Sequence, residues 1–239
     1  MDDPAYDAVL FDLDGTLVSE REGVERSRAA VAALIRGHGH DVSDAQYSRA
    51  AQQAIDDALA ANHGSWPATF SRQEAIRRAL IANDVPADLA PPCEHVYKRE
   101  RMANLALLPD ARAVLDLAQA RGPLGLITNG DSAEQREKLR RCALTEYFDP
   151  LVISDDLGVS KPEPAIFAQA LNALGIPAQR AVYIGNSYAN DVEGGAAVGL
   201  NTIWLNERGS APPANATHLP TAIIRALREL PPLLGFANA

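Results

Sequence analysis

Two aspartates spaced two residues apart follow a short apolar run near the start of the chain. The segment reads Val9-Leu10-Phe11-Asp12-Leu13-Asp14-Gly15-Thr16. A strand buried on both faces is a continuous apolar run, and open α/β sheets bind ligands at the carboxyl ends of such strands. Residues two apart on an extended chain point to the same side, so one carboxylate could attack a substrate while the other handles a proton. The spacing indicates a site for phosphoryl chemistry.

A second polar segment ends a later apolar run. Thr128, Asn129 and Gly130 lead into a predicted helix that begins near Ser132. A hydroxyl and the backbone amides of such a turn can donate several hydrogen bonds to phosphate oxygens. The same residues also suit an ordinary turn, with Asp131 or Ser132 as the helix N-cap. Because this segment follows the Asp12 turn in series, we interpret it as a phosphate-binding turn.

A lysine lies in a loop that leads into another predicted helix. Lys161 is followed by Pro162 and Pro164, and the other lysines of the chain are Lys98 and Lys138. Proline suits the first turn of a helix. A lysine at this point can neutralise charge that develops in a transition state, whereas the alternative is a solvated surface lysine. Since the chain contains so few lysines, we favour the functional interpretation.

With a fourth segment, Val182 to Val192, these motifs resemble in order those of the haloacid dehalogenase-like hydrolase superfamily, whose commonest members are Mg²⁺-dependent phosphatases. The resemblance implies that Asp12 is the nucleophile and forms an aspartyl-phosphate that water hydrolyses. It implies that Asp14 protonates the leaving oxygen and then activates the water. Thr128 and nearby amides would hold the transferring group, and Lys161 would offset its charge.

The resemblance also implies a Mg²⁺ site, formed by Asp12, the backbone carbonyl of Asp14, Asp191 and Asn186. The family usually carries aspartate where Asn186 stands. An amide oxygen can bind Mg²⁺ but supplies no charge, so we expect a weaker metal site with more attraction for anions. Asn190 could be a further ligand, although we favour it as a helix N-cap.

The elements that must position these residues alternate along the chain. Short apolar segments with strand character lie at residues 8–11, 124–128, 151–154, 181–184 and 202–205. From residue 123 onward they alternate with helical stretches at the spacing of βαβ units, which predicts a parallel, Rossmann-like sheet with helices on both faces. A helix over 109–121 would lead into this part, and another over 222–230 would pack on it.

The segment between the first two strands is dominated by helix-forming residues and has no persuasive strand. Breaks at 37–40, 62–67 and 83–86, with Ser43 and Ser71 as N-caps, predict several helices. They could simply cover the sheet, but their number predicts a separate bundle, which resembles the superfamily's helical cap. The predicted core is therefore 1–18 with 109–239, and the cap is 19–108. Cap residues that could reach a leaving group are Arg21, Tyr47, Arg49, His63, Trp66 and Arg72.

Composition limits the partners. The chain has 239 residues, 47% of them hydrophobic, and a formal charge of −9, which opposes nonspecific attraction to nucleic acid or anionic lipid. It contains no signal peptide and no bilayer-spanning run, so we expect a cytoplasmic protein. Cys93 and Cys142 lack metal or redox spacing. The expected partner is a small phosphorylated metabolite, with the protein a monomer or a homodimer.

Four other functions are alternatives to a phosphatase. A sugar-phosphate mutase would share all four motifs and differ in how the cap excludes water. Haloacid dehalogenases characteristically lack an aspartate at position 14, and phosphonate-cleaving relatives use a cap lysine, for which Lys98 is the sole and late candidate. A noncatalytic binding protein could have kept the fold while Asn186 weakened the metal site. The presence of Asp12, Asp14, Thr128 and Lys161 favours an enzyme.

Overall fold

The computed structural model describes residues 6–61 and 71–236. The chain divides into two compact units, one comprising Met1–Ser19 with Ala106–Ala239 and the other comprising Glu20–Leu105. The boundaries predicted from the sequence lie within three residues of these. Among the described residues, none of the helices combines the length and apolar character that a bilayer crossing requires.

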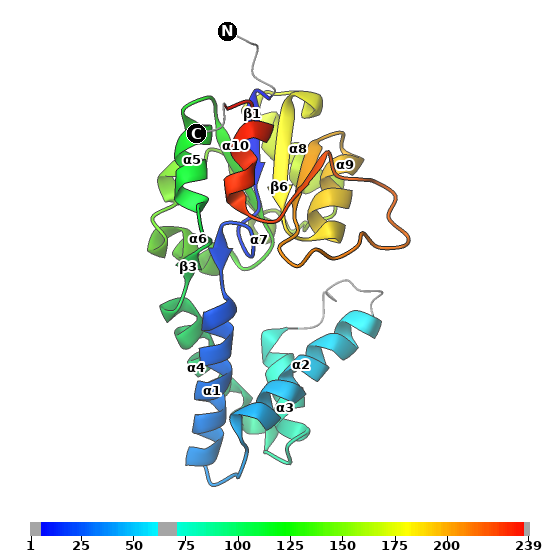
Figure 1. Cartoon of the computed structure of the whole chain (residues 1–239). Helices are drawn as coiled ribbons and strands as arrows, with labels where there is room; N and C mark the ends of the chain where they lie inside the picture. The colour runs from blue at the N-terminus through cyan, green and yellow to red at the C-terminus, as the bar shows by residue number, and fades with distance from the viewer. Residues whose placement is uncertain (1–5, 62–70, 237–239) are drawn as a thin grey trace. The chain divides into compact units, whose positions relative to one another are not determined.

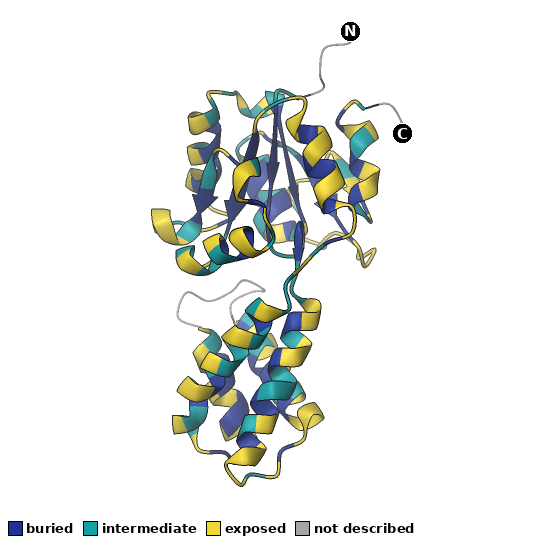
Figure 2. Ribbon diagram, turned by 90° about the vertical axis from the view of Figure 1, so that its left-hand side faces the viewer, coloured by how far each residue is buried: buried dark blue, intermediate teal, exposed yellow. Residues whose placement is uncertain are grey.

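A six-stranded sheet forms the centre of the first unit (Figure 1). Its order is β5-β4-β1-β6-β7-β8, and all neighbouring strands are parallel. The strands are β1 Ala8–Phe11, β4 Leu124–Thr128, β5 Leu151–Ile153, β6 Ala181–Gly185, β7 Asn201–Leu205 and β8 Ala222–Ile224. Strands β1, β4 and β6 are buried along their whole length. Figure 2 shows strands of the sheet in dark blue, the colour of buried residues. The predicted α/β class with a parallel sheet is confirmed.

Helices alternate with these strands and cover the sheet. They are α5 Ala111–Gln119, α6 Ser132–Arg141, α7 Ser154–Leu157, α8 Pro164–Leu174, α9 Gly194–Ala197 and α10 Leu230–Leu233, with the π-helix η4 over Tyr188–Glu193. One core cluster joins β-strand residues such as Leu10 to Phe167 of α8. The Phe167 ring meets Tyr183 of β6 edge-on, with centroids 5.4 Å apart, and so fastens α8 to the sheet.

The helix predicted over 222–230 is wrong. Residues Ala222–Ile224 form the edge strand β8, followed by a 3₁₀ turn at Leu227–Glu229 and the short helix α10. The main reason is pairing with β7, in which Trp204 is opposite Ile223. Two β-branched residues suit a half-exposed edge strand, and the prolines at the start of α10 suit a first helical turn.

The second unit is helical. Its helices are α1 Arg21–Gly37, α2 Asp44–Ala61, α3 Arg72–Ile81 and α4 Ala90–Ala103, with a 3₁₀ turn at Ala87–Leu89. Their apolar faces share a core that includes Ile35, Tyr47 and Leu80. The predicted caps are confirmed, since the hydroxyls of Ser43 and Ser71 accept hydrogen bonds from backbone N–H groups three residues later. The break predicted at 62–67 lies outside the described residues.

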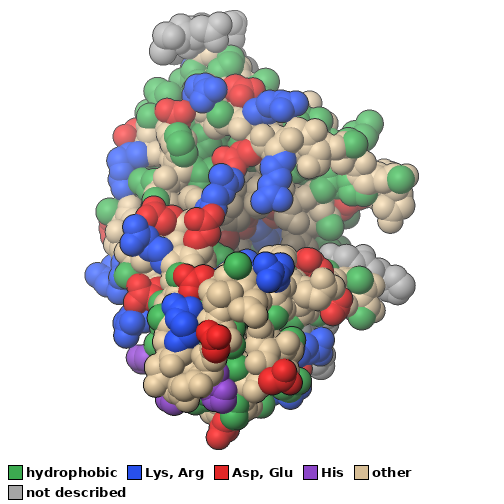
Figure 3. All heavy atoms as spheres, turned by 60° about the horizontal axis from the view of Figure 1, so that its bottom comes forward, with side chains coloured by type: hydrophobic (Ala, Val, Ile, Leu, Met, Phe, Trp, Pro, Cys, Tyr) green, Lys and Arg blue, Asp and Glu red, His purple; other side chains and the backbone are tan. Residues whose placement is uncertain are grey.

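The outer surface of the helical unit carries charges of both signs. Several are paired one turn apart along a helix, including Arg26 with Glu22 and Lys98 with Glu94. Blue and red side chains are accordingly interspersed over the face in Figure 3. Exposed pairs of this kind contribute little stability each, so the packed core is what holds this unit together.

The helical unit is inserted between two short strands. β2 (Val18–Ser19) pairs antiparallel with β3 (Ala106–Leu107), with Ser19 opposite Ala106. Residue patterns do not predict this pair, because two residues are too few to show a period. The chain therefore leaves and re-enters the first unit at neighbouring points.

Candidate active site

The carboxyl ends of the three central strands bring the predicted motifs together. β1 lies between β4 and β6, and all three run parallel. Asp12, Asn129 and Asn186 each directly follow one of these strands. The neighbouring loop before α8 supplies Lys161. One edge of the sheet thus collects residues from four distant parts of the sequence, as expected for open α/β sheets.

Lys161 joins two of the predicted acids in a buried cluster. Its Nζ lies 2.7 Å from Oδ1 of Asp12 and 2.8 Å from Oδ1 of Asp191. All three side chains are buried. Burial raises the pKa of Asp12 to about 6, which the charges of Asp191 and Asp14 favour and the nearby ammonium opposes. Burial alone would lower the pKa of Lys161, but the two carboxylates outweigh it and raise that pKa.

Tyr183 completes this cluster, and sequence reasoning missed it as a functional residue. Its hydroxyl accepts a hydrogen bond from Lys161 Nζ at 2.8 Å and lies 3.1 Å from both the carbonyl oxygen of Ile127 and Oδ1 of Asp191. Burial raises the pKa of Tyr183 well above its ordinary value, so the hydroxyl stays protonated. The available signal was a tyrosine within a strand buried on both faces, whose hydroxyl needs a polar partner.

The π-helix after β6 positions Asp191. The backbone N–H of Ser187 donates to Oδ2 of Asp191 at 2.8 Å. The Ser187 hydroxyl caps the helix by accepting from the N–H of Asn190 at 3.3 Å, so the expected cap at Asn190 is wrong. A Cβ on Gly185 would lie 2.3 Å from Cγ of Asp191. Only glycine therefore lets the carboxylate pack this closely on the end of the strand.

The turn after β1 orients Asp12 and lies against Asn186. The Thr16 hydroxyl donates to Oδ2 of Asp12 at 2.9 Å. Gly15 has φ +80°, a conformation that favours glycine, and a Cβ there would lie 2.3 Å from Nδ2 of Asn186. The Asn186 carboxamide thus packs on the turn that carries Asp12 and Asp14.

The oxygen donors of this edge suit a hard cation. Within the described ranges, 6–61 and 71–236, no group of three or more Asp, Glu, His or Cys side chains could by itself hold a metal ion. Two carboxylates, Asp12 and Asp191, are accompanied by the Asn186 amide and the main-chain oxygens of the turn. Mg²⁺ accepts such mixed oxygen ligands and retains several waters, so the donor set fits it with few charges.

The predicted phosphate-binding turn is held by side-chain contacts. Asn129 clamps the backbone of Lys161, accepting from its N–H at 2.8 Å and donating to its carbonyl oxygen at 3.0 Å. The Thr128 hydroxyl contacts Gln135 at 2.6 Å, and the Gly130 N–H donates to the hydroxyl of Ser154 at 2.9 Å. These contacts link the turn to the Lys161 loop and to α7. Phosphate binding by Thr128, Asn129 and Gly130 stays a prediction.

Asp14 contacts a lysine outside the four motifs. Nζ of Lys138, on α6, lies 2.8 Å from both carboxylate oxygens of Asp14. Nε2 of Gln135, one turn earlier on the same helix, donates to Oδ2 of Asp14 at 2.8 Å. Asp131 caps this helix, as one of the sequence interpretations proposed. Sequence reasoning assigned no role to Lys138 or Gln135, because both lie on a helix between motifs.

The residues considered for leaving-group contact have different surroundings within the helical unit. Tyr47 lies in its core, where burial raises the pKa of the phenol. Arg72 stacks on the ring of Tyr97, with 5.5 Å between the guanidinium carbon and the ring centroid. Arg21 and Arg49 are exposed, and His63 and Trp66 lie outside the described residues.

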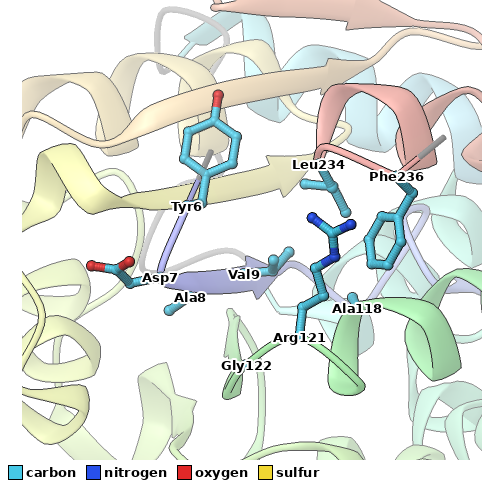
Figure 4. Close-up of a pocket in the computed structure, with 9 residues that line it drawn as sticks. All are labelled: Tyr6, Asp7, Ala8, Val9, Ala118, Arg121, Gly122, Leu234 and Phe236. Carbon is cyan, nitrogen blue, oxygen red and sulfur yellow. The ribbon is translucent and has the colours of Figure 1, made fainter. Parts of the chain in front are cut away.

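A small pocket lies at the opposite end of β1 from Asp12 (Figure 4). Its lining includes Tyr6, Val9 and Leu234, and the guanidinium of Arg121 stacks on the ring of Phe236 at 4.2 Å. None of the predicted catalytic, phosphate-binding or metal-binding residues lines it. Because open parallel sheets bind ligands at their carboxyl ends, this pocket is not the candidate active site.

The chain is similar to known proteins over most of its length. A model of the haloacid dehalogenase-like hydrolase family matches residues 6–199. The chain is 31% identical over 231 residues to N-acylneuraminate-9-phosphatase of Mus musculus, covering 95% of this chain and 93% of that one. It is 32% identical over 229 residues to glyceraldehyde 3-phosphate phosphatase of Methanopyrus kandleri, covering 93% and 94%.

A solved structure supports the same fold. The HAD-hydrolase YfnB of Bacillus subtilis, determined bound to magnesium, superposes with a TM-score of 0.73 at 24% identity, covering 97% of this chain and 99% of that one. The match thus extends over both compact units. With its four motifs on one edge of a parallel sheet and a family match over residues 6–199, the chain belongs to the haloacid dehalogenase-like hydrolase family.

Proposed function

We propose that the protein is a Mg²⁺-dependent phosphatase that hydrolyses a small phosphate monoester through an aspartyl-phosphate. The observation that carries the proposal is the buried cluster in which Lys161 contacts both Asp12 and Asp191 at the carboxyl end of β1 and β6. A positive charge fixed beside a carboxylate nucleophile can offset the charge of an incoming phosphate. Phosphatases among the sequence relatives support the same reaction class.

Asp12 and Asp14 divide the work between two half-reactions. An oxygen of Asp12 attacks phosphorus as the bond to the leaving oxygen breaks, and the protonated carboxyl of Asp14 gives that oxygen its proton. Asp14 then removes a proton from water, whose oxygen attacks phosphorus and releases phosphate from Asp12. The amides and hydroxyl of residues 128–130 hold the transferring group, and Lys161 offsets its charge.

Asp12, Asp191, Asn186 and the carbonyl oxygen of Asp14 are the proposed Mg²⁺ ligands. Bound Mg²⁺ would orient the phosphate and neutralise its charge. The mixed oxygen donors described above support this assignment. Because Asn186 contributes no charge, the loaded site would keep one more positive charge than a site with aspartate at this position.

We propose that the inserted helical unit acts as a cap that selects the leaving group. The named relatives act on an N-acylneuraminate 9-phosphate and on glyceraldehyde 3-phosphate, both small phosphorylated metabolites. A small phosphate ester is therefore the substrate class proposed for this chain. A closing cap suits such esters better than bulky phosphoproteins.

Hydrolysis of p-nitrophenyl phosphate tests the proposal. We expect the purified protein to release p-nitrophenol in proportion to Mg²⁺ occupancy, and we expect Asp12→Asn to abolish turnover because the amide cannot attack phosphorus. Release of free phosphate in equal amount would distinguish a hydrolase from a mutase. Turnover that persists in Asp12→Asn, or that ignores Mg²⁺, would contradict the mechanism.

A further inference from the structure

Lys138 is a buried lysine in the middle of helix α6. Its side chain is 2% exposed, whereas Lys98 on the helical unit is 52% exposed. Nζ contacts both oxygens of Asp14 at 2.8 Å and lies 3.5 Å from Oε1 of Glu134. Removing an ammonium group from water is costly unless it is paired and hydrogen-bonded. The buried ammonium of Lys138 therefore depends on its pairing with the Asp14 carboxylate.

Gln135 makes a second contact with the same carboxylate. It lies three residues before Lys138, which places both side chains on one face of α6. Its Nε2 donates to Oδ2 of Asp14 at 2.8 Å and also lies 2.6 Å from the Thr128 hydroxyl and 2.9 Å from the carbonyl oxygen of Asn129. One buried carboxamide thus connects Asp14 to the predicted phosphate-binding turn.

Two anchors fix a carboxylate better than one. Contact with both oxygens sets the plane of the Asp14 carboxylate, and the Gln135 contact sets its rotation about the side chain. The Asp14 side chain nevertheless remains 32% exposed, so one face stays open to a ligand. Proton transfer depends steeply on such placement, since a displacement of about 1 Å can cost about 100-fold in rate.

We propose that Lys138 and Gln135 are positioning residues that hold Asp14 where it can protonate the leaving-group oxygen. This inference rests on the phosphatase function proposed above. In the step concerned, Asp14 gives its proton to the leaving oxygen as the bond from that oxygen to phosphorus breaks and the bond from Asp12 to phosphorus forms. Neither positioning residue exchanges a proton, and each acts only through its contacts with the Asp14 carboxylate.

A purely structural lysine would behave differently from a positioning one. If Lys138 served only to attach α6 to the sheet, its loss would lower the rate for all esters alike. If it positions the proton donor, its loss should matter most for leaving groups that cannot depart as stable anions. The dependence of rate on the leaving group therefore separates the two roles.

Two aryl esters provide this comparison without knowledge of the natural substrate. We expect Lys138→Met to lower kcat/KM for phenyl phosphate by about 100-fold, the cost of a misplaced proton donor. The same variant should lower kcat/KM for 2,4-dinitrophenyl phosphate far less, because that leaving group needs no proton. kcat/KM reports the first half-reaction, in which the leaving group departs.

Matched variants control for charge and folding. Lys98→Met removes a lysine from the helical unit and should leave both rates unchanged, whereas Lys138→Arg keeps the cation and should recover part of the phenyl phosphate rate. In an Asp14→Asn background, Lys138→Met should add no further selectivity, because coupled residues are not additive. If Lys138→Met fails to fold, Gln135→Met gives the same comparison of the two esters.

The possible outcomes are distinct. An equal fall for both esters, in a variant that unfolds at an ordinary temperature, would overturn the positioning role while leaving the phosphatase proposal intact. A selective fall that persists in the Asp14→Asn background would also overturn it. Failure of the unaltered protein to hydrolyse either ester would instead contradict the proposed function itself.

Discussion

Asn186 is the residue at which this chain departs most from its family's motif pattern. With Mg²⁺ bound, Lys161 and the metal would bring three positive charges against the two negative charges of Asp12 and Asp191. The structure places the Asn186 carboxamide beside the Gly15 turn, next to the proposed ligands. A carboxylate at this position would cancel the excess charge. The amide should therefore lower the affinity for the metal and raise the attraction for an anionic substrate.

Asn186→Asp should therefore bind Mg²⁺ about tenfold more tightly, since ligand charge is a main determinant of affinity at such sites. Isothermal titration of metal-free protein with MgCl₂ measures this directly. Asn172→Asp adds the same charge at an exposed position of α8 and should change the affinity much less. Unchanged or weaker binding by Asn186→Asp would refute the charge argument.

The sequence predicts site residues where they lie in a motif at the end of a strand or near the start of a helix. Asp12, Lys161 and Asp191 follow apolar strands or precede a helix, and the structure places both acids within hydrogen-bond distance of Lys161. Tyr183 and Lys138 carry no such signal, because one lies inside a strand and the other inside a helix. Their roles come from which elements neighbour each other in three dimensions, and local sequence does not encode that.

At the scale of elements, the junction between β6 and the π-helix η4 controls where Asp191 lies. The strand ends at Gly185, and the carboxylate of Asp191 folds back over that residue, held by the N–H of Ser187. Each hydrogen-bonded turn of a π-helix contains one more residue than a turn of an α-helix, and such turns are frequent at functional sites. The geometry depends on the missing side chain at position 185.

Gly185→Ala should displace this carboxylate. The added methyl group would lie 2.3 Å from Cγ of Asp191, so either the side chain or the backbone must move. We expect an overpacking cost of about 1–3 kcal/mol in the free energy of unfolding, measured in urea, together with weaker Mg²⁺ binding. Gly37→Ala is the control, since nothing lies within 4 Å of that position. An affinity equal to that of the unaltered protein would show that Asp191 does not need this contact.

Long-range pairing also explains which elements the sequence could not predict. The central strands are continuous apolar runs, and their type follows from βαβ spacing. Strand β8 has three residues, and its identity comes from its hydrogen bonds to β7. A helix was expected there because local propensity alone does not record that an unpaired sheet edge lies nearby.

At the scale of the whole molecule, the chain has two independent cores. The helical unit buries its own apolar cluster, and the sheet unit is closed by the β2–β3 pair. Arg101 of α4 forms a 3.3 Å ion pair with Glu20, so the insert also holds its own two ends together. Each unit therefore has an apolar core of its own.

Replacing residues 20–105 by a four-residue Gly-Asn loop should leave the sheet unit folded. Ser19 and Ala106 are already paired, so a hairpin loop can join them. We expect a cooperative thermal transition by circular dichroism. Removing only residues 44–81 should instead expose the apolar faces of α1 and α4 and increase binding of a hydrophobic dye. A non-cooperative transition in the first variant would show that the sheet unit depends on the insert.

The insertion of the helical unit between β1 and β4 affects the order in which the chain folds. β1 must pair with β4, from which the entire helical unit separates it in sequence, and closing a longer loop costs more conformational entropy. The helical unit ends at residue 105, so during synthesis it is complete before β4 emerges. Once folded, the helical unit holds residues 20 and 101 together. Pairing of β1 with β4 then closes a shorter loop than it would in the unfolded chain. Folding of the insert should thus lower the entropy cost of pairing β1 with β4.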